Sequence, residues 1–152
     1  MFEWLEETTV ATMIGQSVVL TGLMSAIHLI GLTLIVGGSL VIWLRLLGVL
    51  LAEHSISSIA VTVNRGAIFG LAISLTTGLL LFAPSATAAY ANSTFQIKMM
   101  LLLSALLFHS TIFRRVVRCE EPIGLSLRLM GSIGPMLWFA VAVAGAWFIL
   151  FE

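Results

Sequence analysis

Residues 18–46 read VVLTGLMSAIHLIGLTLIVGGSLVIWLRL and contain one charged residue, Arg45. A helix needs about 20 mostly apolar residues to cross the hydrocarbon core of a bilayer. This stretch is long enough to cross with a tilt, to continue past Arg45 into the interface, or to bend at Gly37–Gly38. Three more continuous apolar stretches follow it, at 59–82, 95–113 and 125–151. Because these runs do not alternate between apolar and polar residues, they predict helices rather than the strands of a membrane barrel.

The composition excludes a soluble domain. Of the 152 residues, 60% are hydrophobic and 9% are charged, whereas soluble domains have about a quarter of their residues charged. The seven basic residues are balanced by seven acidic ones. The chain therefore lacks the excess of basic residues that would suggest binding to nucleic acid. We therefore expect one all-α transmembrane domain over residues 1–152, with the lipid bilayer as its main surroundings.

The basic residues predict the orientation of the chain. Six of the seven flank the first and third connections between the spans: Arg45, Arg65, Arg114, Arg115, Arg118 and Arg128. The positive-inside rule assigns these connections to the cytoplasm and both termini to the periplasmic side. Short connections then favour an up-down four-helix bundle in a bacterial inner membrane. The mixed segment 1–13 is an interfacial candidate.

Two histidines lie within the predicted spans, His28 in the first and His109 in the third. One interpretation is structural: a neutral His28 bonded to a neighbouring helix, and His109 at the interface beside the arginines. The other interpretation is a cofactor site to which both histidines contribute. Counted from Gln16 and Phe95, His28 lies about 18 Å deep and His109 about 21 Å deep. The first and third helices of such a bundle face each other diagonally, so the pair could be the axial ligands of haem b iron.

Other residues support a cofactor more weakly. Lys98 could pair with haem propionates, although extension of its side chain to the lipid headgroups is the more common explanation. Met24 and His28 are four residues apart and share a helix face. Together with Met100, they suggest a Cu(I) site as an alternative to haem. Arg45 beside Trp43 resembles an interfacial anchor pair.

Several kinds of catalytic chemistry find no support in the sequence. It contains no Ser-His-acid set, no paired carboxylates within a span, no glycine-rich phosphate loop and no H-E-x-x-H motif. A stand-alone enzyme is therefore not expected. A subunit of an oxidoreductase complex remains compatible with the sequence.

The chain resembles a bacterial family of small four-helix inner-membrane proteins of unassigned function, which is distantly similar to copper-resistance D-type membrane proteins. The matching elements are Glu3-Trp4-Leu5, Ile27-His28-Leu29-Ile30-Gly31, Leu44-Arg45-Leu46-Leu47-Gly48, Thr77-Gly78, Asn92, Phe95, Lys98 and Phe108-His109. The resemblance implies a four-span bundle and no established reaction. Its distant relatives imply metal handling.

Three hypotheses for the function follow. The first is a haem b-binding subunit that transfers electrons between a membrane or periplasmic redox partner and the quinone pool. His28 and His109 are its expected axial ligands. The second is an accessory subunit of a membrane complex without a cofactor, and the third is a copper-handling membrane protein.

Overall fold

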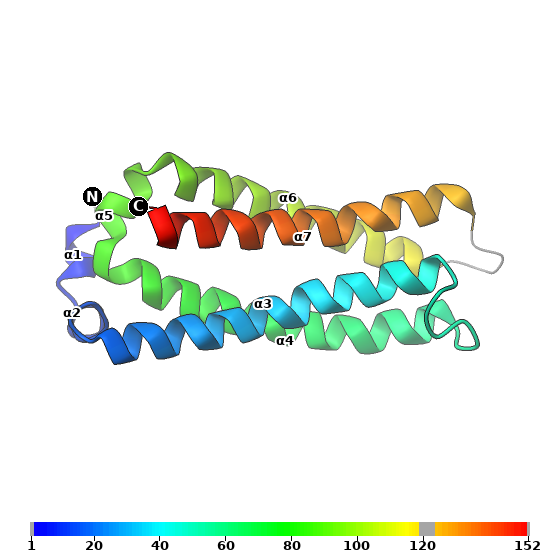
Figure 1. Ribbon diagram of the computed structural model, residues 1–152, viewed down its shortest axis with the longest axis horizontal. Coiled ribbons are helices and arrows are strands. Elements are labelled where there is room, and N and C mark those ends of the chain that lie inside the picture. The colour runs from blue at the N-terminus through cyan, green and yellow to red at the C-terminus, as the bar shows by residue number, and fades with distance from the viewer. Residues whose placement is uncertain (1, 119–123, 152) are drawn as a thin grey trace.

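The structure is a computed structural model that describes residues 2–118 and 124–151, and these contain helices and no strands. The elements in chain order are α1 (Glu3–Glu6), α2 (Thr9–Gln16), α3 (Val18–Leu46), α4 (Ile56–Phe82), the 3-10 helix η1 (Ala83–Ser85), α5 (Ala86–Ala91), α6 (Ser93–Val117) and α7 (Leu125–Phe151). Figure 1 shows the four long helices side by side, with both chain ends at one end of the bundle. We call this the terminal end. The opposite end, where residues 47–55 join α3 to α4, is the loop end.

Four helical segments are long and apolar enough to cross a membrane, as the sequence predicts: Val18–Leu46, Ile56–Ala91, Ser93–Val117 and Leu125–Trp147. Their number, length and composition are those of a multi-pass membrane protein. Helices α3 and α7 have the expected limits, whereas α4 and α6 begin earlier than expected. The reason is capping, because the side chains of Ser55 and Asn92 accept backbone N–H bonds from Ser58 and Thr94.

The long helices form two antiparallel hairpins, α3 with α4 and α6 with α7. The hairpins pack together through α3 against α7 and α4 against α6. Figure 1 shows this arrangement as one pair of ribbons lying over the other. Each helix runs opposite to its successor, which gives the expected up-down bundle.

Helices α3 and α4 approach most closely at two glycines. A methyl group on Gly31 would lie 2.7 Å from the Gly70 carbonyl oxygen, and one on Gly70 would lie 2.6 Å from the Gly31 carbonyl oxygen. Such distances allow only hydrogen at both positions, and close contact through small residues is a common way for membrane helices to associate. Gly66, one helical turn from Gly70, has open space beside it instead.

The most continuous core lies towards the loop end. Its buried members are Ile42, Leu46, Ile56, Ala60, Ile112 and Val116. Arg45 is buried with them at 4% exposure, and it donates bonds of 2.9 and 2.6 Å from Nε and Nη2 to the His54 carbonyl oxygen. The expected interfacial anchor is therefore wrong for Arg45. Its charge-assisted bonds hold the connection between α3 and α4 against the bundle.

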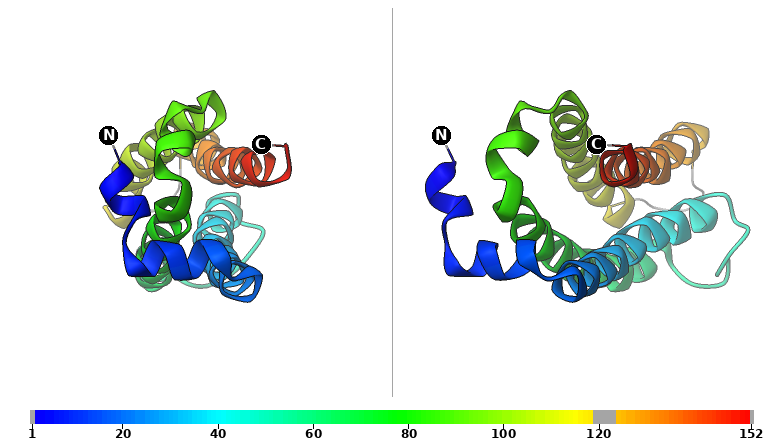
Figure 2. Two further views of the ribbon diagram at one scale, coloured as in Figure 1. Left: turned by 90° about the vertical axis from the view of Figure 1, so that its left-hand side faces the viewer. Right: turned by 60° about the vertical axis from the view of Figure 1, so that its left-hand side comes forward.

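The terminal end is crossed by the short helices α1, α2 and α5, as Figure 2 shows. The ring of Phe2 packs against Phe82 and Tyr90, with centroid distances of 5.9 and 5.3 Å. Glu6 Oε1 accepts a 2.7 Å bond from the backbone nitrogen of Thr87. These contacts tie the N-terminal segment to the helix ends beneath it.

Candidate functional site

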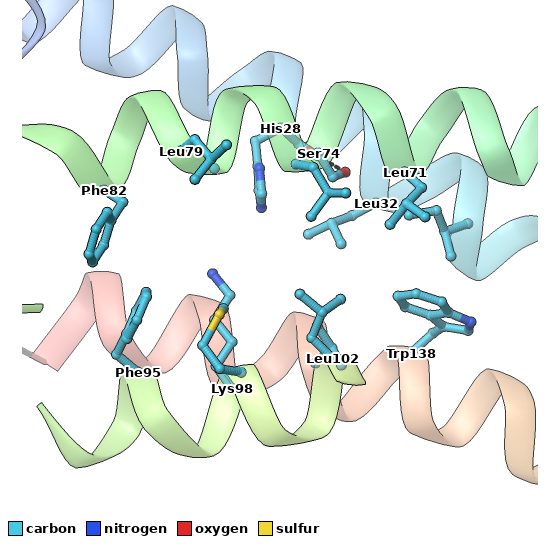
Figure 3. A pocket seen from close by; sticks show the side chains of 15 residues that line it. His28, Leu32, Leu71, Ser74, Leu79, Phe82, Phe95, Lys98, Leu102 and Trp138 are labelled. Atoms are coloured by element: carbon cyan, nitrogen blue, oxygen red, sulfur yellow. Dashed lines mark hydrogen bonds between the residues drawn. The ribbon is translucent and has the colours of Figure 1, made fainter. Parts of the chain in front are cut away.

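The half of the bundle nearer the terminal end contains a cavity between the two hairpins, with a volume of about 200 Å³. All four long helices contribute to its wall, which is almost entirely aliphatic and aromatic. His28 on α3 and Lys98 on α6 are its two ionisable residues. Figure 3 shows the imidazole of His28 and the amino group of Lys98 directed towards each other across this space. An apolar cavity with a few convergent polar groups is the usual form of a small-molecule site.

The His28 ring is oriented by α4. Its Nδ1 lies 3.0 Å from Thr77 Oγ1, and that hydroxyl lies 2.7 Å from the Ile73 carbonyl oxygen. Since a hydroxyl has one proton, and the carbonyl takes it, the Thr77 oxygen accepts from Nδ1–H. His28 Nε2 then carries a lone pair.

Small residues of α4 make room for this ring. A methyl group on Gly78 would lie 3.2 Å from His28 Cε1. One turn away, Ser74 donates a 3.4 Å bond to the backbone oxygen of His28. A histidine whose other nitrogen donates to a fixed acceptor is the usual form of a metal-ligating imidazole.

The Lys98 side chain lies inside the bundle. It packs against α7 at Gly145, where a methyl group would lie 3.3 Å from Lys98 Nζ. The expected extension to the lipid headgroups is therefore wrong. Glycine at position 145 leaves the space that the lysine stem occupies.

No acidic residue of the sequence lies within α3, α4, α6 or α7. The seven glutamates are Glu3, Glu6, Glu7, Glu53, Glu120, Glu121 and Glu152. Among the residues that the structure describes, Lys98 has no ion-pair partner. An ammonium group in an apolar setting is costly unless it is paired. The cavity is therefore suited to a ligand that carries a negative charge or a strong hydrogen-bond acceptor.

His109 lies in a different environment, towards the loop end. Its Nε2 is 3.1 Å from Asn64 Oδ1 on α4, and its ring meets Trp138 edge-on at a centroid distance of 6.3 Å. The space nearby is small. A cavity of about 40 Å³ lies between His109 and Trp138, which is enough for a water molecule.

Trp138 belongs to the wall that separates the two regions. The residue is 2% exposed, and its Nε1 has no hydrogen-bond partner among the described residues. Ile35, Leu71 and Trp138 line both the large cavity and the small one. In Figure 3 the indole nitrogen points away from His28 and Lys98.

The structure does not bring His28 and His109 together. Their partners, Thr77 and Asn64, are thirteen residues apart on α4, or about 20 Å along the helix axis. A single iron atom cannot bond to both rings in this arrangement. The two histidines are not at similar depth, contrary to expectation, because the starts of the two helices are not level. His28 faces Lys98, but the two residues are at different distances from the starts of their helices. Counted in residues, Lys98 is half as far from the start of α6 as His28 is from the start of α3.

The residues suggested for copper are also dispersed. Met100 is 71% exposed, and neither Met24 nor Met100 lines the cavity beside His28, which Met99 does line. In the described part of the chain, no three His, Cys, Asp or Glu side chains are grouped so that they could hold a metal ion. The geometry therefore favours His28 with Lys98 over the other predicted combinations.

Comparison with known proteins gives a family and no activity. A family of unknown function (DUF6644) matches residues 1–151. The chain belongs to this family. No curated protein and no solved structure matches the chain. Membership agrees with the expected family of unassigned function, so the site must be interpreted from its own residues.

The partners of both histidines could not be predicted from the sequence. Thr77 and Asn64 are polar residues within the second apolar stretch, and polar side chains in membrane helices commonly bond to a neighbouring helix. That rule marks them as candidates but does not say which histidine each contacts. The position of Trp138 in the cavity wall could not be predicted, because an isolated tryptophan in an apolar helix is usually a core residue.

Proposed function

We propose that this protein is a haem b-binding subunit of a bacterial inner-membrane electron-transfer chain, with His28 as the iron ligand. The observation that carries the proposal is the arrangement of His28 and Lys98 on opposite sides of one apolar cavity. The Thr77 bond leaves His28 Nε2 available to a metal. Lys98 offers a positive charge to a carboxylate.

In chemical type, these groups match haem better than a bare metal ion. A macrocycle needs more space than about 200 Å³, so haem would also have to occupy the adjoining cavity of about 240 Å³ that shares His28 and Lys98. Haem has a metal centre that imidazole can bind, an apolar ring and carboxylate groups on that ring. In the proposed site, His28 Nε2 would hold the iron, Lys98 would pair with a propionate, and the aliphatic and aromatic wall would exclude water. His109 is not a ligand in this proposal. When bound, haem supplies a one-electron couple between a membrane or periplasmic redox partner and the quinone pool.

The proposed orientation follows from the arginines. Arg114, Arg115 and Arg118 lie at or beyond the end of α6, and Arg128 lies in the first turns of α7, so all four are at the loop end. The positive-inside rule then places the loop end in the cytoplasm and both termini in the periplasm.

The test is the haem content and the reduced-minus-oxidised spectrum of protein purified after expression with ample haem. We expect a b-type signal in the wild type, its loss in His28→Ala, and its retention in His109→Ala. Lys98→Met keeps the apolar stem and removes the charge, so it should weaken haem retention without abolishing it. Met24→Leu, one turn from His28, is the matched control.

Three results would contradict the proposal. Absence of a b-type signal in the wild type supports a subunit without a cofactor. Stoichiometric copper in place of haem supports the copper alternative. Equal loss of haem in His28→Ala and His109→Ala would mean that both rings hold the iron. The distance between the two rings is too large for that in the proposed site.

A further inference from the structure

The large cavity is closed towards the terminal end by aromatic rings. Phe82 and Phe95 both line it, and their rings stack at a centroid distance of 5.1 Å with an angle of 19°. The ring of Phe2 also packs against Phe82, in an edge-to-face arrangement. A route from water at the terminal end would have to separate these rings and the helices that cover them (Figure 2).

The cavity is also closed towards the loop end. Ile35 and Trp138 are almost completely buried, at 1% and 2% exposure, and they belong to one core cluster with Ala105 and Val141. The core around Leu46 lies beyond them. Neither aqueous end of the bundle therefore offers an open path to His28 and Lys98.

The sides of the bundle differ from each other. On the side of α4 and α6, the cavity is lined by Leu75, Leu79 and Met99, whose bulky side chains are exposed at the surface of the bundle. On the side of α3 and α7, a second cavity of about 240 Å³ shares His28, Leu32 and Lys98 with the first. Its other walls include four small residues: Ser25, Ala142, Gly145 and Ala146. We call this second cavity the α3–α7 window.

The α3–α7 window faces the surroundings at the level of Lys98. Ala146 and its neighbour in the wall, Leu29, are exposed side chains of two membrane-crossing segments. In Figure 1, α3 and α7 separate towards the terminal end, which is the half of the bundle where this cavity lies. At this depth an exposed surface contacts hydrocarbon rather than water.

We propose that the ligand of the His28–Lys98 cavity reaches it from the hydrocarbon layer, through the α3–α7 window. The ligand is a membrane-dissolved amphiphile. Its anionic or acceptor group goes to Lys98, and its apolar part passes between the small residues of α3 and α7. This inference deepens the proposed function by naming the route and the ligand class, and it holds equally for an amphiphile other than haem.

The experiment uses the fact that Lys98 is the only lysine in the sequence. Full-length protein in nanodiscs, with both aqueous ends accessible, is treated at alkaline pH with phenyl isothiocyanate or with its water-soluble 4-sulfophenyl counterpart. Mass spectrometry then measures modification of the peptide containing Lys98. We expect the lipid-soluble reagent to modify Lys98 and the sulfonated one to leave it unmodified. Both should react after denaturation, which controls for chemical reactivity.

Variants locate the route. Ala146→Phe narrows the α3–α7 window and should slow modification by phenyl isothiocyanate, and Ala142→Leu is a milder second variant in case the first misfolds. Val143→Phe is the matched control, because Val143 is exposed on the same helix and lines neither cavity. Equal rates for both reagents in folded protein would overturn the route from the membrane. If Val143→Phe slowed the modification of Lys98 as much as both window variants do, the α3–α7 window would be overturned as the route. Neither outcome depends on whether the protein binds haem.

Discussion

Both histidines of the long apolar helices hydrogen-bond to a polar side chain of α4, but their surroundings differ. His28 bonds to Thr77 and borders a cavity of about 200 Å³. His109 bonds to Asn64 beside a cavity of about 40 Å³. The neighbours account for this difference, because His28 lies against Gly78 and His109 lies against Trp138.

The comparison shows that a histidine within a membrane helix is not a ligand merely because it is costly to bury. In membranes, a hydrogen bond to another helix offsets part of the cost of burying the polar ring. Whether the second ring nitrogen can serve a ligand depends on free space, which is a property of the neighbours. The following predictions test the difference between the two regions.

The largest effect is expected for Gly31→Val, beside His28. The new side chain would meet the Gly70 backbone at less than 3 Å, and backbone cannot yield as a flexible side chain does. We expect α3 and α4 to separate, at a cost of about 3 kcal/mol or more. Thermal unfolding in detergent, with the yield of monodisperse protein, measures this. Gly22→Val on the same helix, with open space beside it, should be tolerated, and equal damage by both variants would argue against the close contact.

A smaller effect is expected for Asn64→Leu, which removes the partner of His109. An unsatisfied polar group should cost about 1–2 kcal/mol of unfolding free energy in this setting. Replacing both residues, Asn64→Leu with His109→Leu, should recover part of that loss, because no polar group then remains unpaired. The double-mutant cycle measures the coupling. Haem content should not change in Asn64→Leu, and a decrease would mean that the His109 region belongs to the site.

The smallest effect is expected for Trp138→Phe, in the wall between the regions. Phenylalanine keeps a ring and removes an indole N–H that has no partner among the described residues. The losses in packing and the gain from removing that donor partly cancel, so we expect a change within about 1 kcal/mol. Unfolding free energy is again the measurement. Trp138→Ala is the contrasting variant, since it opens the wall and should cost about 3 kcal/mol or more.

The positions of the helices could be predicted because the membrane imposes a one-dimensional requirement. Enough apolar residues in succession must form a helix that satisfies its own backbone, and this rule located α3 and α7 correctly. Candidate ligands could be predicted by the same logic, since an ionisable residue such as His28 or Lys98 stands out in an apolar stretch. The sequence by itself therefore determined how many long apolar helices there are and which residues are unusual within them.

The tertiary structure alone decided which of those residues meet. The relative level of two helices depends on where each begins and how it tilts, and these offsets separated His28 from His109 and placed His28 opposite Lys98. The direction of Lys98 depended on a glycine 47 residues later in the chain, at Gly145. Arg45 bonds to the His54 carbonyl oxygen, which lies in the connection that follows its helix. Apolar periodicity carries no information about such contacts, because lipid and protein interior are equally apolar to a helix face.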